Sequence, residues 1–233
     1  DLATRQVADP AIASRWLDKV RPLLDKDDLR NRLSLTDAYF AIGRRAERQD
    51  LIGLSDSLLM KLAEDFPESA DVSLMQAIRY EITGENDKAA KKYRKTLELV
   101  PHQPVAANNL AMSIVTHGGD LTEAAALIGA IIEKSPNVAA FHDTAAQVAA
   151  KQGNLPSAIE HLEKAVELEP DSVEWRVNLA EIMVQADKLD EARQLVERMD
   201  NVDLNDRRIS PAVREKLQAL RDRFAEELVT PAP

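Results

Sequence analysis

The sequence predicts an all-α fold, an α-solenoid of antiparallel helical hairpins. Three observations predict it: a helix-forming composition, prolines that recur at a nearly constant spacing, and glycines placed between those prolines. Only 7 of the 233 residues are glycine and 4% are aromatic, whereas Leu, Ala, Glu, Lys and Arg, which favour helix, recur throughout. Internal periods of about 20–50 residues are typical of helical repeat arrays, so the period decides the fold class.

The prolines set the period. Pro67, Pro101, Pro136 and Pro170 are spaced 34, 35 and 34 residues apart. Each follows a stretch with helical periodicity, such as RKTLELVP or EKAVELEP. Proline cannot continue the helical hydrogen-bond ladder, and it disfavours helix in the residue before it. Each proline therefore marks the end of a helix at the same point of every unit.

A glycine lies inside each complete unit, at Gly84, Gly118 and Gly153. Glycine adopts positive φ without steric cost and can close the first helix of the unit. A second helix is expected to begin behind an N-terminal signal, which is Asp87, Thr122 or the 154–156 stretch. Each unit therefore reads as helix, turn, helix and proline.

This pattern resembles the tetratricopeptide repeat family, whose 34-residue unit carries small residues at positions 8, 20 and 27, and the paired units are similar to those of bacterial members. Position 8 holds Gly43, Ala77, Ala111, Ala146 and Ala180. Position 20 holds Ser55, Ala89, Ala124, Ala158 and Ala192. Small side chains let the two helices of a hairpin approach closely. Position 27 departs from the pattern except at Ala165, because the other units hold Leu62, Thr96, Ile131 and Met199.

The resemblance implies a right-handed superhelix of five repeats with a helix at each end. The repeats are expected at 33–67, 70–101, 104–136, 138–170 and 172–204. Residues 1–32 are expected to hold the second helix of a truncated repeat and a linker, as in a piece cut from a longer bacterial protein. Because Pro22 has no N–H to donate, that helix should kink or end near Arg21. Residues 205–233 are expected to form a capping helix, with Ser210 as N-cap, and a disordered tail from Thr230 to Pro233.

Composition and motifs argue against several functions. A net charge of −10 opposes nonspecific binding to nucleic acid or anionic lipid. The chain has no cysteine and no apolar run approaching the roughly 18 residues of a membrane-spanning helix. Its four histidines lack metal-ligand spacing, and no glycine-rich phosphate loop occurs. We therefore expect no enzyme activity, no cofactor, no metal site and no membrane insertion, in either cytoplasm or periplasm.

The resemblance also implies a binding groove, lined by the first helix of each hairpin. The residues at the groove positions of the family are Asp71, Leu74, Met75, Ile78, Asn108, Asn109, Met112, Thr116, Asp143, Thr144, Gln147, Lys151, Val177, Asn178, Glu181 and Gln185. The amides of Asn109 and Asn178 could pair with the main chain of a bound protein segment, or could simply face water. No Lys or Arg stands where the carboxylate clamp of the family needs one. The acidic groove residues favour a basic or neutral segment.

Two other functions remain open from the sequence. Open-ended solenoids can stack end to end, so the chain could form homo-oligomers. It could also be the docking arm of a larger envelope, secretion or transferase protein. Trp16 and Trp175 could anchor a partner, but their apolar-periodic helices favour core packing between hairpins.

Overall fold

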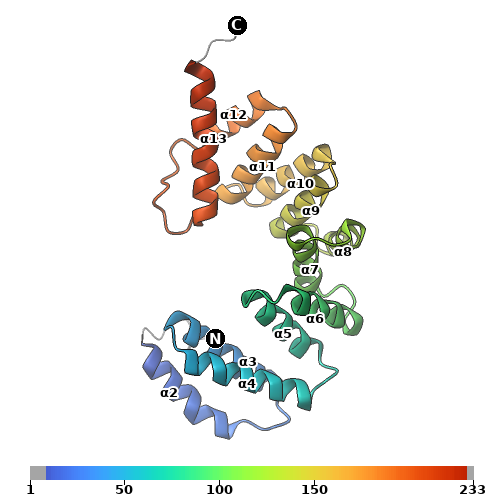
Figure 1. The fold of residues 1–233 in the computed structure, drawn as a ribbon, viewed down its shortest axis with the longest axis vertical. Helices are drawn as coiled ribbons and strands as arrows, with labels where there is room; N and C mark the ends of the chain where they lie inside the picture. The colour runs from blue at the N-terminus through green and yellow to red at the C-terminus, as the bar shows by residue number, and fades with distance from the viewer. Residues whose placement is uncertain (1–8, 230–233) are drawn as a thin grey trace. The chain divides into compact units, whose positions relative to one another are not determined.

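The computed structural model describes residues 9–229, which form twelve α-helices, one short 3₁₀ helix and no strand (Figure 1). The all-α prediction is confirmed. None of the helices in this range is long and apolar enough to cross a membrane. The chain divides into two compact units, unit 1 up to Pro101 and unit 2 from His102 onward. The tail expected at Thr230 to Pro233 lies outside the described residues.

Unit 1 holds one single helix and two hairpins. Its helices are α2 (Pro10–Val20), η1 (Arg21–Leu23), α3 (Leu29–Arg45), α4 (Gln49–Asp65), α5 (Ala70–Ile82) and α6 (Asn86–Leu99). Helix α2 ends at Val20 and continues as a 3₁₀ turn, so the break predicted near Arg21 is confirmed. Helix α3 begins at Leu29, ahead of the expected repeat start at residue 33, because the Asp28 carboxylate accepts the Asn31 N–H at 3.1 Å and caps it.

Unit 2 holds three hairpins and a final helix. Its helices are α7 (Pro104–His117), α8 (Leu121–Lys134), α9 (Ala139–Lys151), α10 (Leu155–Leu168), α11 (Val173–Gln185), α12 (Leu189–Glu197) and α13 (Pro211–Val229). Helix α13 packs on α11 and α12. Its contacts bury Val213, Leu217, Leu220 and Phe224. The Ser210 hydroxyl accepts the Val213 N–H at 3.3 Å, as the predicted N-cap requires.

The glycine turns are confirmed. Gly84, Gly118 and Gly153 have φ of 78°, 91° and 80°, which an L side chain would adopt only with strain. The first and last hairpins lack this glycine and place Glu47 and Asp187 at positive φ instead. The α8 signal differs from the expectation at Thr122, because Asp120 is the cap that accepts the Thr122 N–H at 2.8 Å.

The small residues at positions 8 and 20 are buried in every hairpin, with Ala77, Ala111, Ala158 and Ala192 completely inaccessible. Gly43 shows how close the helices approach. A Cβ atom built there would lie 2.8 Å from the Ile52 side chain and 3.0 Å from the Ile52 backbone nitrogen. Position 27 is also buried in every repeat, although four of the five residues there are larger than alanine. The larger side chains fill the space between the helices, so close packing is kept.

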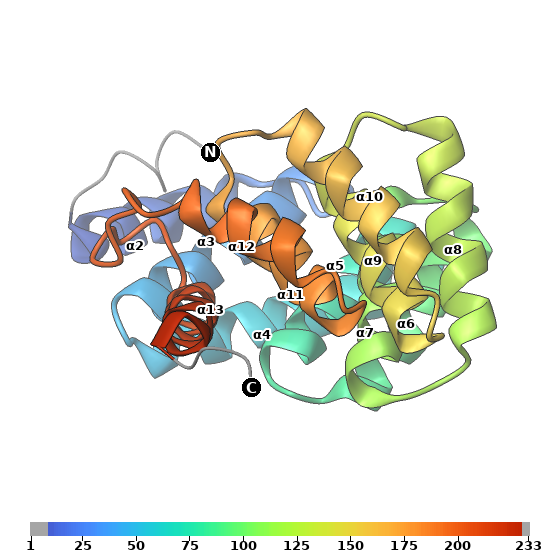
Figure 2. The ribbon, with the colours of Figure 1, turned by 90° about the horizontal axis from the view of Figure 1, so that it is seen from above.

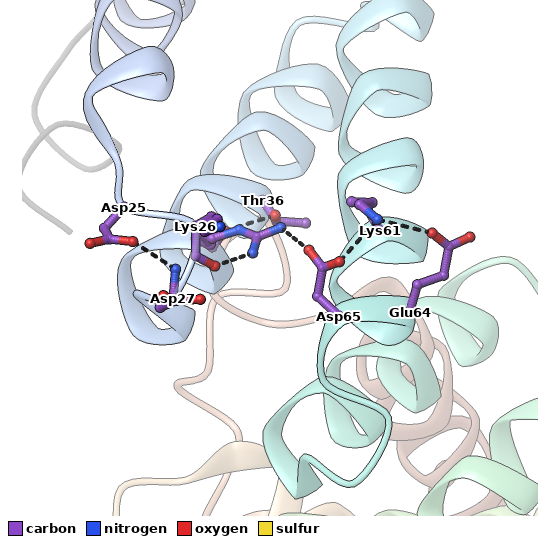
Figure 3. Close-up of polar contacts among 8 residues, drawn as sticks. Asp25, Lys26, Asp27, Thr36, Lys61, Glu64 and Asp65 are labelled. Atoms are coloured by element: carbon purple, nitrogen blue, oxygen red, sulfur yellow. Dashed lines mark hydrogen bonds and ion pairs between the residues drawn. The ribbon is translucent and has the colours of Figure 1, made fainter.

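A polar clamp ties α3 to α4 in unit 1. Asp65 accepts one hydrogen bond from Arg32 on α3 at 2.8 Å and pairs with Lys61 on its own helix at 2.9 Å. Figure 3 shows Asp65 beside Lys61, with Glu64 on the far side of Lys61. Arg32 also donates to the Lys26 carbonyl at 2.5 Å. The clamp therefore fixes the loop that precedes α3 as well as the end of α4.

The two tryptophans differ. The core position expected for Trp16 is wrong, because its side chain is 63% exposed on α2 beside exposed Ile12. Trp175 is partly buried, and its indole N–H donates to the Glu169 carboxylate at 3.2 Å. Helix α2 therefore carries apolar residues on two faces. Only the face with Ala13 packs into the core of unit 1.

Candidate functional site

The sixteen residues predicted to line a groove fall into three groups. Four lie in a cleft of unit 1, six lie in a cleft of unit 2, and the remaining six lie on α7 or are buried. Each cleft is built within one unit. The two clefts are therefore separate sites.

The unit 1 cleft lies between α3 and α5 and has a volume of about 340 Å³. All four residues predicted on α5 line it: Asp71, Leu74, Met75 and Ile78. Helix α3 adds Leu33, Asp37 and Phe40, which sequence reasoning missed. Asp37 and Asp71 are exposed, so the cleft is apolar inside with two carboxylates on its rim.

Arg79 forms part of the wall of this cleft. Its guanidinium carbon lies 3.3 Å from the centroid of the Phe40 ring, and its side chain is buried. The same guanidinium donates to Asp56 at 2.7 Å and to the Ser55 hydroxyl at 3.2 Å. Burial lowers the pKa of Arg79, and Asp56 opposes the shift. Because its charge is already paired, the arginine shapes the cleft more than it charges it.

The unit 2 cleft lies between α9, α11 and α13 and has a volume of about 440 Å³. Six predicted residues line it: Asp143, Gln147, Lys151, Asn178, Glu181 and Gln185. The far wall comes from α13 through Ala212, Val213 and Lys216, which sequence reasoning missed. The helix expected only to cap the array therefore also bounds a cleft.

A hydrogen-bonded network crosses the unit 2 cleft. The Asp143 carboxylate accepts from the Gln147 amide at 2.7 Å and from the Asn178 amide at 2.9 Å. Lys216 donates to the Glu181 carboxylate at 2.7 Å and to the Asn178 side-chain oxygen at 3.4 Å. Burial raises the pKa of Asp143, whereas its two amide donors and the positive charge of Lys216 act to lower it. Three helices are joined by this network.

The cleft contains a second basic residue beside the predicted Lys151. Lys216 reaches it from α13 and pairs with Glu181. Thr144 and Val177 are buried and do not line the cleft, and the Thr144 hydroxyl donates to the Ala140 carbonyl at 3.1 Å. The repeat pattern therefore predicts the helix on which these two residues lie, but it does not predict their burial.

The four residues predicted on α7 are Asn108, Asn109, Met112 and Thr116. Asn108 donates to the Asn109 side-chain oxygen at 3.4 Å. The Asn108 side-chain oxygen is buried and has no hydrogen-bond partner among the described residues. A role for these residues in a groove stays a prediction.

A larger cavity of about 720 Å³ lies beside the loop 198–210, but it contains none of the predicted residues. It is lined mainly by acidic and loop residues, including Asp203 and the Asp206–Arg208 pair. Within residues 9–229 no group of three or more His, Asp or Glu side chains is arranged to hold a metal ion.

Comparison with known proteins identifies the family. Tetratricopeptide repeat models match residues 74–139 and 149–217. The chain belongs to the tetratricopeptide repeat family. No curated protein matches its sequence.

Solved tetratricopeptide structures share the fold. A tetratricopeptide repeat protein from Parabacteroides merdae superposes with a TM-score of 0.69 at 16% identity, covering 95% of this chain and 80% of that one. PilF from Pseudomonas aeruginosa superposes with a TM-score of 0.61 at 17% identity, covering 88% of this chain and 96% of that one. TTC0263 from Thermus thermophilus superposes with a TM-score of 0.58 at 21% identity, covering 87% of this chain and 100% of that one. Proteins of this family are generally non-enzymatic scaffolds that bind peptide or protein partners.

Proposed function

We propose that this protein is a scaffold that binds an extended or helical protein segment in the clefts lined by the first helices of its hairpins. The observation that carries the proposal is the unit 2 cleft. Six side chains predicted from repeat positions line one 440 Å³ space between α9, α11 and α13. All six carry a side-chain amide or a charge, which can bond a polypeptide main chain.

Asn178 is the residue best placed to exchange partners. Its amide nitrogen donates to buried Asp143, but its oxygen contacts Lys216 only at 3.4 Å, the long end of the hydrogen-bond range. A main-chain N–H of a bound segment can replace Lys216 there without disturbing Asp143. Lys216 would keep its shorter contact with Glu181. The cleft can therefore accept a segment at little cost to its own network.

Charge favours a basic or neutral segment. The unit 2 cleft presents Asp143, Glu174 and Glu181 against Lys151 and Lys216, and one of those lysines is already paired. The unit 1 cleft carries Asp37 and Asp71 on an apolar wall. An acidic segment would meet carboxylates at both clefts, so repulsion disfavours it.

A random peptide library panned against the purified protein tests the proposal. We expect the selected peptides to be basic or neutral. Asn178→Ala should lower the affinity of these peptides by a similar factor whatever their side chains, on the order of 1 kcal/mol for one lost main-chain contact. Asn109→Ala, on α7, tests whether that helix contributes in the same way.

Glu181→Lys should selectively weaken basic peptides. Glu191→Lys makes the same charge change at an exposed position of α12 and is the matched control. Peptides that bind equally well to Asn178→Ala and Glu181→Lys, or that map by NMR away from α9, α11 and α13, would contradict the proposal.

Self-assembly is a second candidate function, favoured by the exposed apolar face of α2. Ile12 and Trp16 on α2 are 45% and 63% exposed, and Leu23 in the following η1 turn is 80% exposed. Light scattering across a concentration range measures it directly. A concentration-dependent dimer that disappears in Trp16→Ser would support assembly through α2, and a monomer at every concentration would exclude it.

A further inference from the structure

Two histidines that are far apart in sequence meet inside the fourth repeat. His142 on α9 and His161 on α10 face one another with 3.2 Å between their Nδ1 atoms, and their ring centroids lie 5.5 Å apart. His142 is buried and His161 is partly buried. The two helices lie side by side along the hairpin (Figure 2). Nothing in their spacing of 19 residues suggests a pair.

The surroundings of His142 fix where the protons are. Its Nε2 atom lies 2.9 Å from the Pro136 carbonyl oxygen. A carbonyl can only accept, so Nε2 carries the hydrogen and neutral His142 has a bare Nδ1. The hydrogen between the rings is then on Nδ1 of His161, which donates to His142. The neutral pair therefore has one defined tautomeric state. Its hydrogen bonds join α9 to α10 and to the loop before α9.

This arrangement admits one added proton but not two. One added proton can be accommodated, because the hydrogen bond between the two Nδ1 atoms needs only one hydrogen and either ring can supply it. A second added proton places a hydrogen on both Nδ1 atoms. Two donors and two positive charges would then face one another across 3.2 Å in a partly buried contact. The doubly protonated pair is incompatible with the closed hairpin.

Few charges modify this balance. Burial lowers the pKa of His161, and His142 on α9 lowers it further, whereas Glu160 on α10 raises it. Within the described residues, the charges that act on His161 come from α9 and α10 alone, although α11 also packs on α10. A histidine whose folded pKa is depressed contributes stability that is present above its unfolded pKa of about 6.5 and is lost as pH falls through the folded value. The contact therefore weakens in acid.

The pair is next to the unit 2 cleft. His142 immediately precedes Asp143, whose carboxylate holds the Gln147 and Asn178 amides. We propose that the His142–His161 pair is a proton-operated latch, which holds α9 on α10 at neutral pH and releases it on double protonation, so that the cleft network opens. The regulatory consequence rests on the proposed function, whereas the latch itself does not.

NMR without any ligand tests the latch. Ring nitrogen shifts at about pH 7.5 should show His142 protonated at Nε2 and His161 at Nδ1. On lowering the pH toward about 5, the pair should titrate in two separated steps, and the side-chain amide signals of Gln147 and Asn178 should shift with the second step. Hydrogen exchange corrected for its intrinsic pH dependence should show α9 losing at least about tenfold protection, the change in equilibrium that one pKa unit represents.

His161→Asn is the informative variant, because its amide can still donate to Nδ1 of His142 but cannot be protonated. It should keep α9 protected in acid. His102→Asn removes an exposed histidine of the same unit and should behave as the wild type. The latch is wrong if both histidines titrate independently near pH 6.5, or if wild type and His161→Asn lose α9 protection together. If the latch operates but panned peptides bind equally at both pH values, the latch stands and the proposed role of the cleft fails.

Discussion

The two clefts use the same backbone plan for different chemistry. In unit 1, α3 and α5 enclose an apolar space whose only buried charge, Arg79, is stacked on Phe40 and paired with Asp56. In unit 2, α9 and α11 face α13 across a polar network centred on Asp143. The hairpin geometry is set by the small buried residues in both units. The side chains on the first helices, and the helix that lies opposite them, decide what each cleft can bind.

The difference implies different sensitivities. The unit 1 cleft is part of a core, so changes in its wall should cost stability. The unit 2 cleft is a network of partly exposed polar groups around the buried Asp143 carboxylate, so changes to the exposed groups should mainly alter binding and local structure. Because the chain has two compact units, unfolding need not be two-state, and hydrogen exchange read helix by helix is the appropriate measurement.

The largest effect is expected for Phe40→Ala in unit 1. It removes a buried ring and leaves Arg79 without its stacking partner, so the free energy of unfolding of unit 1 should fall by about 3–5 kcal/mol. Phe66→Ala is the matched control, because Arg32 lies 5.6 Å from that ring and the ring is only partly buried. Urea unfolding followed by hydrogen exchange measures both. Equal losses in the two variants would show that the Arg79 contact adds nothing.

Overpacking of a hairpin contact should lower the free energy of unfolding by less than Phe40→Ala does. Ala158→Leu or Ala111→Leu adds a branched side chain where no surface is accessible, so each should destabilise unit 2 by roughly 1–3 kcal/mol. Lys151→Ala, an exposed change in the same unit, should move stability by less than about 0.5 kcal/mol. Thermal unfolding of the three variants checks the repeat register, which would be wrong if their Tm shifts were the same.

The sequence predicts the local features of the fold better than the contacts between helices. The helices, the turn glycines and the buried small residues follow from local rules, because each depends on residues a few positions apart. Lys216 and the His142–His161 pair could not be found in this way, because each contact joins helices that the repeat pattern aligns only approximately. Trp16 was misplaced because an apolar helix period does not reveal whether both of its faces are covered.

An intermediate effect is expected for Asp143→Asn in unit 2. Burial raises the pKa of Asp143, so its contribution to stability is fully present below its unfolded pKa of about 3.9 and is lost as pH rises through the folded value. Asn cannot ionise. The variant should therefore gain stability relative to the wild type as pH rises from about 4 to 7, by about 1 kcal/mol or less. Urea unfolding at several pH values measures this gain, and a difference that is constant with pH would contradict the raised pKa.

The smallest effect on stability, and the sharpest test of the comparison, is expected for Lys216→Gln. The Lys216 and Glu181 side chains are 42% and 31% exposed, so solvent screens their attraction and its loss should change the free energy of unfolding by less than about 0.5 kcal/mol. The Asn178 side-chain amide signal should nevertheless move, because its oxygen loses a cationic donor. Basic peptides selected from the library should bind more tightly, since Glu181 is then free to pair with them. Lys95→Gln is the matched control, because it breaks the 3.0 Å ion pair between α6 and Glu68 in the turn before α5 of unit 1 and should change neither the Asn178 signal nor the binding. A large loss of stability in Lys216→Gln would show instead that the polar network is part of the unit 2 core, and the distinction between the two clefts would fail.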